Sequence, residues 1–257
     1  MAFGAQAQVI PVGFMKMNSG FVNIPTPNPP PVTNGLILYL DATQSASYSG
    51  SGTAWNDVSG QSPAGPATLV GSPTFGSGSL ANGSGSFTFG ANINAKTTKT
   101  YTIDRSITYI AWVNPSQFQN NQVGIISRRT DANGGHTGLT INSSNNLGYD
   151  WSNQYHSDRF NLFVPNLQWS MIAVTINATT ATGYLCKSTG ITSSSIGHIF
   201  VSVSGAGATH FTISYEPYSY PNRQFKGKMA TAMVYSTCLT SDDITSIFNA
   251  QKASFGL

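Results

Sequence analysis

The segment ITYIAWV, which covers residues 107–113, decides the fold class of this chain. Successive side chains of a strand point to opposite faces, so Tyr109 and Val113 share one face while Trp112 lies on the other. Both faces are therefore apolar, which is typical of a strand that is covered on both sides. We expect residues 107–114 to form a buried strand of an all-β protein.

Turn signals separate this segment from others like it along the chain. Asn-Gly, Gly-Ser and Asn-Asn pairs, which favour turns, stand between short runs rich in β-branched and aromatic residues. About ten such runs with few helical patterns predict an antiparallel β-sandwich. The other predicted strands are residues 36–41, 67–70, 86–89, 123–128, 137–142, 147–151, 168–177, 183–186, 198–203 and 211–215.

One short helix is predicted near the C-terminus, over about residues 241–250. It begins with a hydroxyl side chain at the N-cap, and Asp242 and Asp243 fall in its first turn, where the helix dipole favours anions. Apolar side chains at positions i, i+3 and i+4 then give it one buried face. These side chains are Ile244, Ile247 and Phe248.

Residues 1–34 are predicted to form an extended arm, and residues 35–257 the sandwich domain. Six of the 13 prolines lie before residue 35, and those from Pro25 to Pro31 favour polyproline II. The stretch before them is too apolar for a simple linker, so we expect the arm to bind another protein. The alternative is that it wraps its own domain. The arm residues assigned to partner binding are Phe3, Val9, Ile10, Phe14, Phe21, Pro25, Pro29 and Pro31.

The low charge of the chain excludes several classes of function. Only 8% of the 257 residues are charged, the net charge is +3, and lysines and arginines form no cluster, so no nucleic-acid partner is expected. No apolar run is long enough for a membrane-spanning helix, so no membrane partner is expected. The N-terminus has neither a charged start nor a compact apolar stretch, so we expect no signal peptide.

Four stretches in order resemble the laminin-G-like branch of the concanavalin A-like jelly roll, and together they cover about residues 35–250. The resemblance implies an antiparallel sandwich followed by one C-terminal helix. Relatives of this fold include glycosidases, lectins, adhesion modules and virion proteins, so the fold alone does not give the function. The stretches are residues 35–42 with 55–60, residues 106–115, residues 169–175 with 183–185, and residues 225–235 with 239–248.

The sequence predicts no enzyme. A glycosidase needs two carboxylates beside the scissile bond, and glucanases of the resembled fold carry them on one strand as Glu-x-Asp-x-x-Glu. This chain has a single glutamate, Glu216, and its aspartates are scattered. No serine lies in the strand–turn–helix setting of a nucleophile. We therefore predict no catalytic residues.

No cofactor is expected either. Laminin-G-like modules often hold calcium at a rim, and Asp131 and Asn133 could offer oxygens for such an ion. The same Asp-x-Asn-Gly pattern is also a good turn, and this interpretation is favoured. Cys186 and Cys238 could form one disulfide, although two buried thiols are favoured.

Two segments have the composition of a surface that binds glycans or proteins. Residues 149–156 and 215–223 combine aromatic rings with amides, an imidazole and a guanidinium, and the sequence does not separate the two kinds of partner. Trp55 is interpreted as a plug over the sandwich edge, with sugar stacking as the alternative. The candidate residues in the two segments are Tyr149, Trp151, Asn153, Tyr155, Tyr218, Tyr220 and Arg223.

Two functions follow from these observations. The leading prediction is a structural protein at the surface of a virus or bacteriophage particle, as a minor capsid, decoration or tail component that docks through its arm. Its partners would be other virion proteins or further copies of itself. The alternative is a carbohydrate-binding adhesion module that recognises glycans on a host surface.

Overall fold

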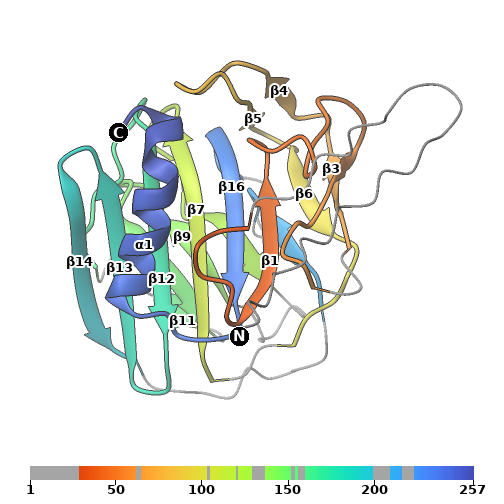
Figure 1. Ribbon diagram of the computed structural model, residues 1–257. Coiled ribbons are helices and arrows are strands. Elements are labelled where there is room, and N and C mark those ends of the chain that lie inside the picture. The colour runs from red at the N-terminus through yellow and green to blue at the C-terminus, as the bar shows by residue number, and fades with distance from the viewer. Residues whose placement is uncertain are drawn as a thin grey trace, which may run out of the picture.

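Two antiparallel sheets stack face to face, and one helix covers the outer face of the first sheet (Figure 1). This confirms the predicted sandwich with one C-terminal helix. The computed structural model describes residues 29–61, 65–102, 105–119, 121–128, 137–151, 154–155, 160–198, 209–215 and 223–257.

The first sheet, called sheet I, has the strand order β14-β13-β12-β7-β16-β5-β4, and β1 pairs with β16 beside β5. β7 is the buried strand that was predicted over residues 107–114, and it lies between β12 and β16 in the middle of the sheet. The strands of sheet I are β1 (Leu36–Asp41), β4 (Thr74–Gly76), β5 (Ser86–Phe89), β7 (Ile107–Pro115), β12 (Ser170–Ile176), β13 (Thr180–Lys187), β14 (Gly190–Gly197) and β16 (Gly227–Tyr235).

The second sheet, sheet II, has the order β11-β10-β9-β8-β15-β6-β3-β2. Strands distant in sequence meet in it, since β15 pairs with both β8 and β6. The strands of sheet II are β2 (Ala54–Trp55), β3 (Ala67–Val70), β6 (Asn94–Thr97), β8 (Val123–Arg128), β9 (Thr137–Ile141), β10 (Leu147–Trp151), β11 (Gln154–Tyr155) and β15 (Phe211–Ile213).

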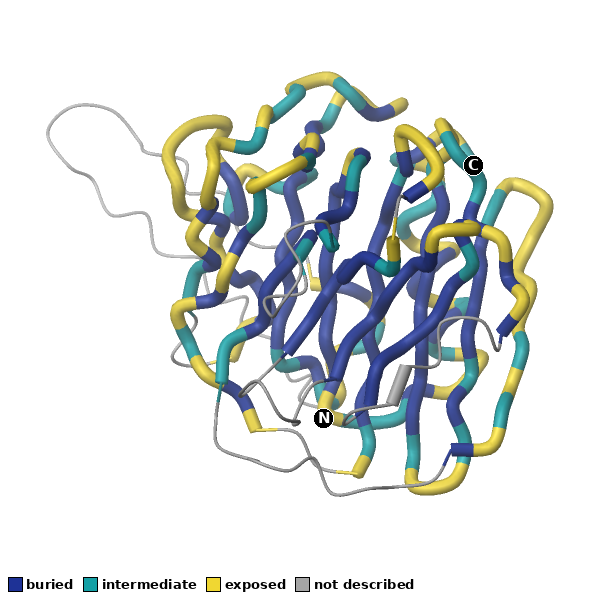
Figure 2. The backbone as a smooth tube through the Cα atoms, turned by 180° about the vertical axis from the view of Figure 1, so that it is seen from behind, coloured by how far each residue is buried: buried dark blue, intermediate teal, exposed yellow. Residues whose placement is uncertain are grey.

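The alternation along β7 places apolar side chains in two separate cores. Tyr109 and Val113 belong to the core between the sheets, whereas Ile110 and Trp112 belong to the core between sheet I and the helix. Figure 2 shows that the central strands of the sandwich are buried along most of their length, while the exposed residues lie in the connections and in strands at the sheet margins such as β14. Burial of a large apolar side chain contributes about 1.5–3 kcal/mol, so these two cores stabilise the three layers.

Helix α1 (Ser241–Gln251) continues into the short 3₁₀ helix η1 (Lys252–Phe255). Thr240 is its N-cap and forms a capping box with Asp243, which satisfies backbone groups at the helix start. The helix packs its apolar face on sheet I, and the ring of Phe255 stacks on Trp112 with centroids 3.8 Å apart. The predicted helix is thus confirmed and ends one residue later. Among the described residues, no helix has the length and apolar character of a membrane span.

Some sequence expectations differ from the structure. A strand was predicted over residues 198–203, but His198 belongs to no strand, and residues 199–203 lie outside the described ranges. The strand in this part of the chain is β14, which ends at Gly197. Trp55 is fully buried against Phe87, with ring centroids 4.9 Å apart, so sugar stacking on Trp55 is wrong. Cys186 and Cys238 are both free thiols, but only Cys186 is buried as favoured, whereas Cys238 is partly exposed. Burial raises the pKa of Cys186 to about 12.

Candidate functional site

Tyr149 and Trp151 are core residues, so their assignment to an exposed glycan or protein surface is wrong. Their exposed fractions are 0% and 1%, because both side chains point inward from β10. The Tyr149 hydroxyl lies 3.0 Å from Nδ1 of His198, and the His198 ring meets Trp151 edge to face. The two aromatic residues alternate with Gly148 and Asp150 along β10, so both side chains fall on the same face of the strand. Their residue types are common in sugar-binding sites, but this alternation places them in the core.

The other predicted residues are only partly described. The backbone of Tyr155 pairs with Asp150, and its side chain lies outside the described part. Arg223 is half-buried, and its carbonyl accepts a hydrogen bond from Gly124 N at 3.4 Å. Within the described ranges, no three His, Cys, Asp or Glu side chains are grouped to hold a metal ion. The predicted site residues outside those ranges are Asn153, Tyr218 and Tyr220 for glycans or partners, and Asp131 and Asn133 for calcium.

The described end of the arm lies on its own domain. Pro30 is buried between exposed Pro29 and Pro31, and Val32 packs against the core under the helix. The Tyr235 hydroxyl donates a hydrogen bond of 3.0 Å to the Val32 carbonyl. These residues contact their own domain, as the alternative of a wrapping arm expects, and the predicted partner binding of Pro29 and Pro31 stays a prediction. Phe3, Val9, Ile10, Phe14, Phe21 and Pro25 lie outside the described ranges.

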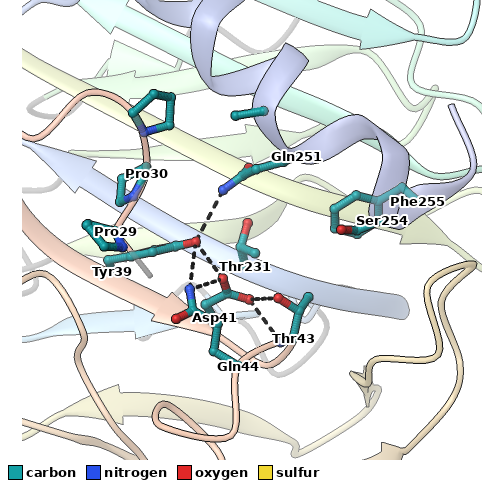
Figure 3. A pocket seen from close by; sticks show the side chains of 12 residues that line it. Pro29, Pro30, Tyr39, Asp41, Thr43, Gln44, Thr231, Gln251, Ser254 and Phe255 are labelled. Atoms are coloured by element: carbon teal, nitrogen blue, oxygen red, sulfur yellow. Dashed lines mark hydrogen bonds between the residues drawn. The ribbon is translucent and has the colours of Figure 1, made fainter. Parts of the chain in front are cut away.

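A pocket of about 120 Å³ lies where this arm segment meets the end of β1 and the last turn of α1. Figure 3 shows Asp41 at its centre, with Tyr39 and Gln251 above it. The Asp41 carboxylate accepts hydrogen bonds from the Tyr39 hydroxyl, from Gln44 Nε2 at 2.7 Å, and from Thr43 N and Oγ1 at 2.9 and 2.6 Å. These four donors occupy the four acceptor positions of a carboxylate, so Asp41 offers none to a ligand.

The same network fixes the helix to sheet I. Gln251 Nε2 donates to the Tyr39 hydroxyl at 3.2 Å, and Gln251 Oε1 accepts from Trp112 Nε1 at 2.7 Å. The Trp112 indole N–H is thus satisfied by a side-chain amide. Burial, and next the Asp41 charge, raise the pKa of Tyr39 above its ordinary value. We interpret the pocket as a structural joint between β1 and α1.

A second surface presents aromatic rings to solvent. The rings of Phe118 and Phe163 have centroids 6.0 Å apart, and their side chains are 55% and 46% exposed. Leu167, which is 74% exposed, is tied to the same end of the sandwich because its N–H donates to the Pro115 carbonyl at 2.7 Å. Large apolar side chains gathered on a surface mark interaction sites. We call Phe118, Phe163 and Leu167 the aromatic platform.

Buried amides hold the two loops that carry the platform. Asn145, in the turn between β9 and β10, donates to the Val164 carbonyl at 3.3 Å and to Asn166 Oδ1 at 2.6 Å. Its Oδ1 accepts from Gln119 N at 3.1 Å, next to Phe118. Asn145 is fully buried, so its three bonds are shielded from water. One side chain therefore connects the loop of Phe118 with the loop of Phe163.

Gln119 fixes the first loop from its other side. Its Oε1 accepts from Lys226 N at 3.0 Å, and its Nε2 donates to the carbonyls of Gln117 and Lys226 at 2.9 and 3.2 Å. Gln119 is 2% exposed, whereas its neighbour Phe118 faces water. The polar side chain is buried and the apolar one is exposed, which reverses the usual arrangement. The hydrogen bonds of Gln119 therefore hold this loop in a conformation that leaves the Phe118 ring exposed to solvent.

The loops that carry the platform are polar and uncharged. Residues 114–122, 142–146 and 161–168 contain no charged side chain and are rich in asparagine, glutamine and serine. The sequence pattern does not single out Phe118 and Phe163, because a single phenylalanine in a loop gives no periodic signal. The available signal was the phenylalanine flanked on both sides by glutamine at positions 117–119.

Comparisons with known proteins identify the family. No curated protein sequence matches this chain. Domain 4 of AbnA, an extracellular arabinanase of Geobacillus stearothermophilus solved in complex with arabinotriose, has a similar structure (TM-score 0.60, 15% identity, 82% of this chain and 97% of that chain). A botulinum neurotoxin type C chain, described as interacting with two ganglioside molecules, also has a similar structure (TM-score 0.59, 15% identity, 85% of this chain and 52% of that chain). Trypanosoma rangeli sialidase is a third similar structure (TM-score 0.57, 15% identity, 85% of this chain and 33% of that chain). This chain therefore spans about half of the toxin chain and a third of the sialidase.

The TM-scores of these structures show a shared fold. The family model described as the concanavalin A-like lectin/glucanases superfamily, of the laminin-G type, matches residues 82–245, which is more than half of the sequence. The matched region runs from just before β5 into the first half of α1 and includes the aromatic platform. The chain belongs to the concanavalin A-like lectin/glucanase superfamily.

Proposed function

We propose that this protein binds carbohydrate and that the aromatic platform is its contact surface. The observation that carries the proposal is the exposed pair Phe118 and Phe163, held in place by the buried amide of Asn145. A surface fixed before binding loses less conformational entropy when a ligand arrives. The rigid attachment of exposed rings therefore favours a binding role over a packing role.

The chemistry of the platform suits a sugar. One face of a sugar ring carries C–H groups, and these are attracted to the electron-rich face of an aromatic ring. The hydroxyl groups at the rim of the sugar need donors and acceptors, which the side chains of Gln117, Asn161 and Gln168 supply as exposed amides. The loops carry no charge, so we expect neutral saccharides to bind better than sialylated ones.

Similar structures support this proposal. The arabinanase domain is described in complex with arabinotriose, and the toxin chain as interacting with gangliosides. We further propose a role in binding without catalysis, since the chain has one glutamate and its scattered aspartates suggest no carboxylate pair. The predicted place on a virus particle and the docking role of the arm stay predictions.

A glycan array with neutral and sialylated saccharides, followed by calorimetric titration of the strongest ligand, tests the proposal. Phe118→Ala and Phe163→Ala should each weaken binding about tenfold, which corresponds to the loss of about 1.4 kcal/mol. Val70→Ala is the matched control, because Val70 is 45% exposed on β3 and lies outside the platform. An array without any bound glycan, or unchanged affinity in the double variant, would contradict the proposal.

A further inference from the structure

Leu167 combines two unfavourable features at one position of the aromatic platform. Its φ is +57°, in the left-handed region, where the Cβ atom of an L-residue lies too close to the following carbonyl oxygen. Its side chain is also 74% exposed, so the leucine gains little from apolar burial in return. Neither feature stabilises the fold, and a leucine at this position therefore needs another explanation.

The other residues that share this backbone conformation are of a different kind. In the described part of the chain, all the other non-glycine residues with a positive φ are asparagine or serine. Their short polar side chains can form hydrogen bonds with the nearby backbone, which makes this conformation more tolerable. Leu167 is the large apolar exception, and strained residues of this kind cluster at ligand sites. The asparagines and serines are Ser72, Asn92, Asn145, Asn161 and Ser214.

The surrounding structure holds the backbone of Leu167 in place. Its N–H donates to the Pro115 carbonyl at 2.7 Å, at the end of β7. The side chain of the preceding residue, Asn166, accepts a hydrogen bond of 2.6 Å from the buried amide of Asn145. On the other side, β12 begins at Ser170 and pairs with β7. The direction of the Leu167 side chain is therefore fixed before any ligand arrives.

The aromatic platform spans both sheets at this end of the sandwich. Phe163 lies beside the start of β10 in sheet II, because it pairs with Asn146 in an isolated bridge. Leu167 lies beside the end of β7 in sheet I. Stacked sheets are about 10 Å apart, so the backbone segments that carry Phe163 and Leu167 are anchored at a similar separation. We expect one sugar ring on the phenylalanines to leave Leu167 uncovered.

We propose that Leu167 contacts a further unit of a linear neutral oligosaccharide, which lies across this end of the sandwich from sheet II to sheet I. The role of Leu167 rests on the carbohydrate binding proposed above. Its exposed neighbour Gln168 offers an amide to sugar hydroxyls beside the apolar contact, as Gln117 does beside Phe118. The ligand is thus a saccharide chain with one unit for each side chain of the platform.

The exposure of the platform also favours a chain over a single sugar. Sites that hold one small molecule are concave and bury most of its surface. Phe118, Phe163 and Leu167 instead extend into solvent, so each of them contacts a sugar unit from one side only. Such a contact contributes little by itself, and several must act together to exceed the cost of lost translational and rotational freedom.

Stability and binding should change in opposite directions at this position. Leu167→Asn removes the apolar contact and introduces a side chain that tolerates a positive φ. We expect a Tm about 1–3 °C higher than that of the unmodified protein. Binding of a trisaccharide should be about fivefold weaker. Ser72→Asn is the matched control, because it introduces the same residue at a φ of 55° in the turn between β3 and β4 and should leave the affinity unchanged.

Calorimetric titration with saccharides of increasing length locates the contact. The probe is the neutral saccharide that binds best on the glycan array, in lengths of one to four units. In the unmodified protein, the affinity should rise up to the third unit. In Leu167→Asn, the disaccharide should bind as it does to the unmodified protein, and the gain from the third unit should disappear.

The outcomes separate this contact from the binding function as a whole. If Leu167→Asn binds every length as the unmodified protein does, while Phe118→Ala still weakens binding, the role of Leu167 is refuted and the proposed function stands. A Leu167→Asn variant with an unchanged or lower Tm would contradict the strain at this position and would also refute that role. An array without any bound glycan would overturn both proposals.

Discussion

The amide of Asn145 donates a hydrogen bond of 2.6 Å to the side-chain oxygen of Asn166, and this bond joins the turn after β9 to the segment that follows Phe163. Asn145 also has a positive φ of 57°, a conformation that asparagine tolerates better than most residues. Both its backbone and its side chain are therefore matched to this turn.

Replacement of this residue should affect stability and binding together. Asn145→Ala leaves the Gln119 N–H and the Val164 carbonyl without their partner and places alanine at positive φ. We expect a loss of about 2–4 kcal/mol in the free energy of unfolding, measured by urea titration, and weaker glycan binding. Asn145→Gly relieves the backbone strain and should be less harmful. Equal losses in both variants would contradict a contribution from the backbone conformation.

Gln251 connects the helix to the core of sheet I. Gln251→Met keeps the side-chain size but leaves the Trp112 N–H without its acceptor and removes a donor to Tyr39. An unpaired buried donor costs about 1–3 kcal/mol, and we expect a loss of this size in chemical unfolding. Ser246→Ala, at an exposed position of the same helix, should change stability little. A Gln251→Met variant as stable as the control would show that the network is dispensable.

Gly227 allows a close approach of β16 to the end of β7. Its φ is +156°, and a Cβ atom there would lie 2.5 Å from the Asn114 carbonyl oxygen. Gly227→Ala should reduce the free energy of unfolding by more than about 2 kcal/mol. Gly90→Ala meets nothing within 4 Å and serves as the control, with an expected change within about 0.5 kcal/mol. Similar stability of the two variants would contradict the steric explanation.

His198 should make stability depend on pH. It is 5% exposed beside Tyr149 and Trp151, and desolvation lowers its pKa below the ordinary value. Since the folded state then favours the neutral ring, this contribution is complete above the unfolded pKa of about 6.5 and is lost as pH falls toward the folded pKa. Urea titrations from about pH 7 to about pH 5 should show a decrease in the free energy of unfolding. His198→Gln should lack this part of the decrease, and an unchanged pH profile in that variant would exclude His198 as its source.

The sequence predicts the strands of this protein well where they are buried on one or both faces. β7, β8 and β10 show apolar side chains at strand spacing, and α1 has both a cap and a helical apolar face. β14 lacks this signal because it is a polar strand at the margin of a sheet, held by the β13 backbone rather than by side chains. Periodic burial is visible in a sequence, whereas backbone pairing alone is not.

The candidate site was harder to predict than the fold. Tyr149 and Trp151 have the residue types of a sugar site, but strand alternation places them in the core. Phe118 has the residue type of a core, but Gln119 occupies the buried position next to it and leaves the ring in solvent. Composition indicates which groups are present, and only the packing of the loops decides which of them reach the surface.

The pairing of β1 with β16 sets the time at which this protein can finish folding during its synthesis. Leu36 lies opposite Tyr235, so the first strand of sheet I finds its partner only when nearly all of the chain has left the ribosome. Until then β1, β5 and β7 lack the strand that joins them. A sandwich closed by such distant contacts should mature slowly, and nascent chains that stop short of β16 should depend on chaperones to stay free of aggregation.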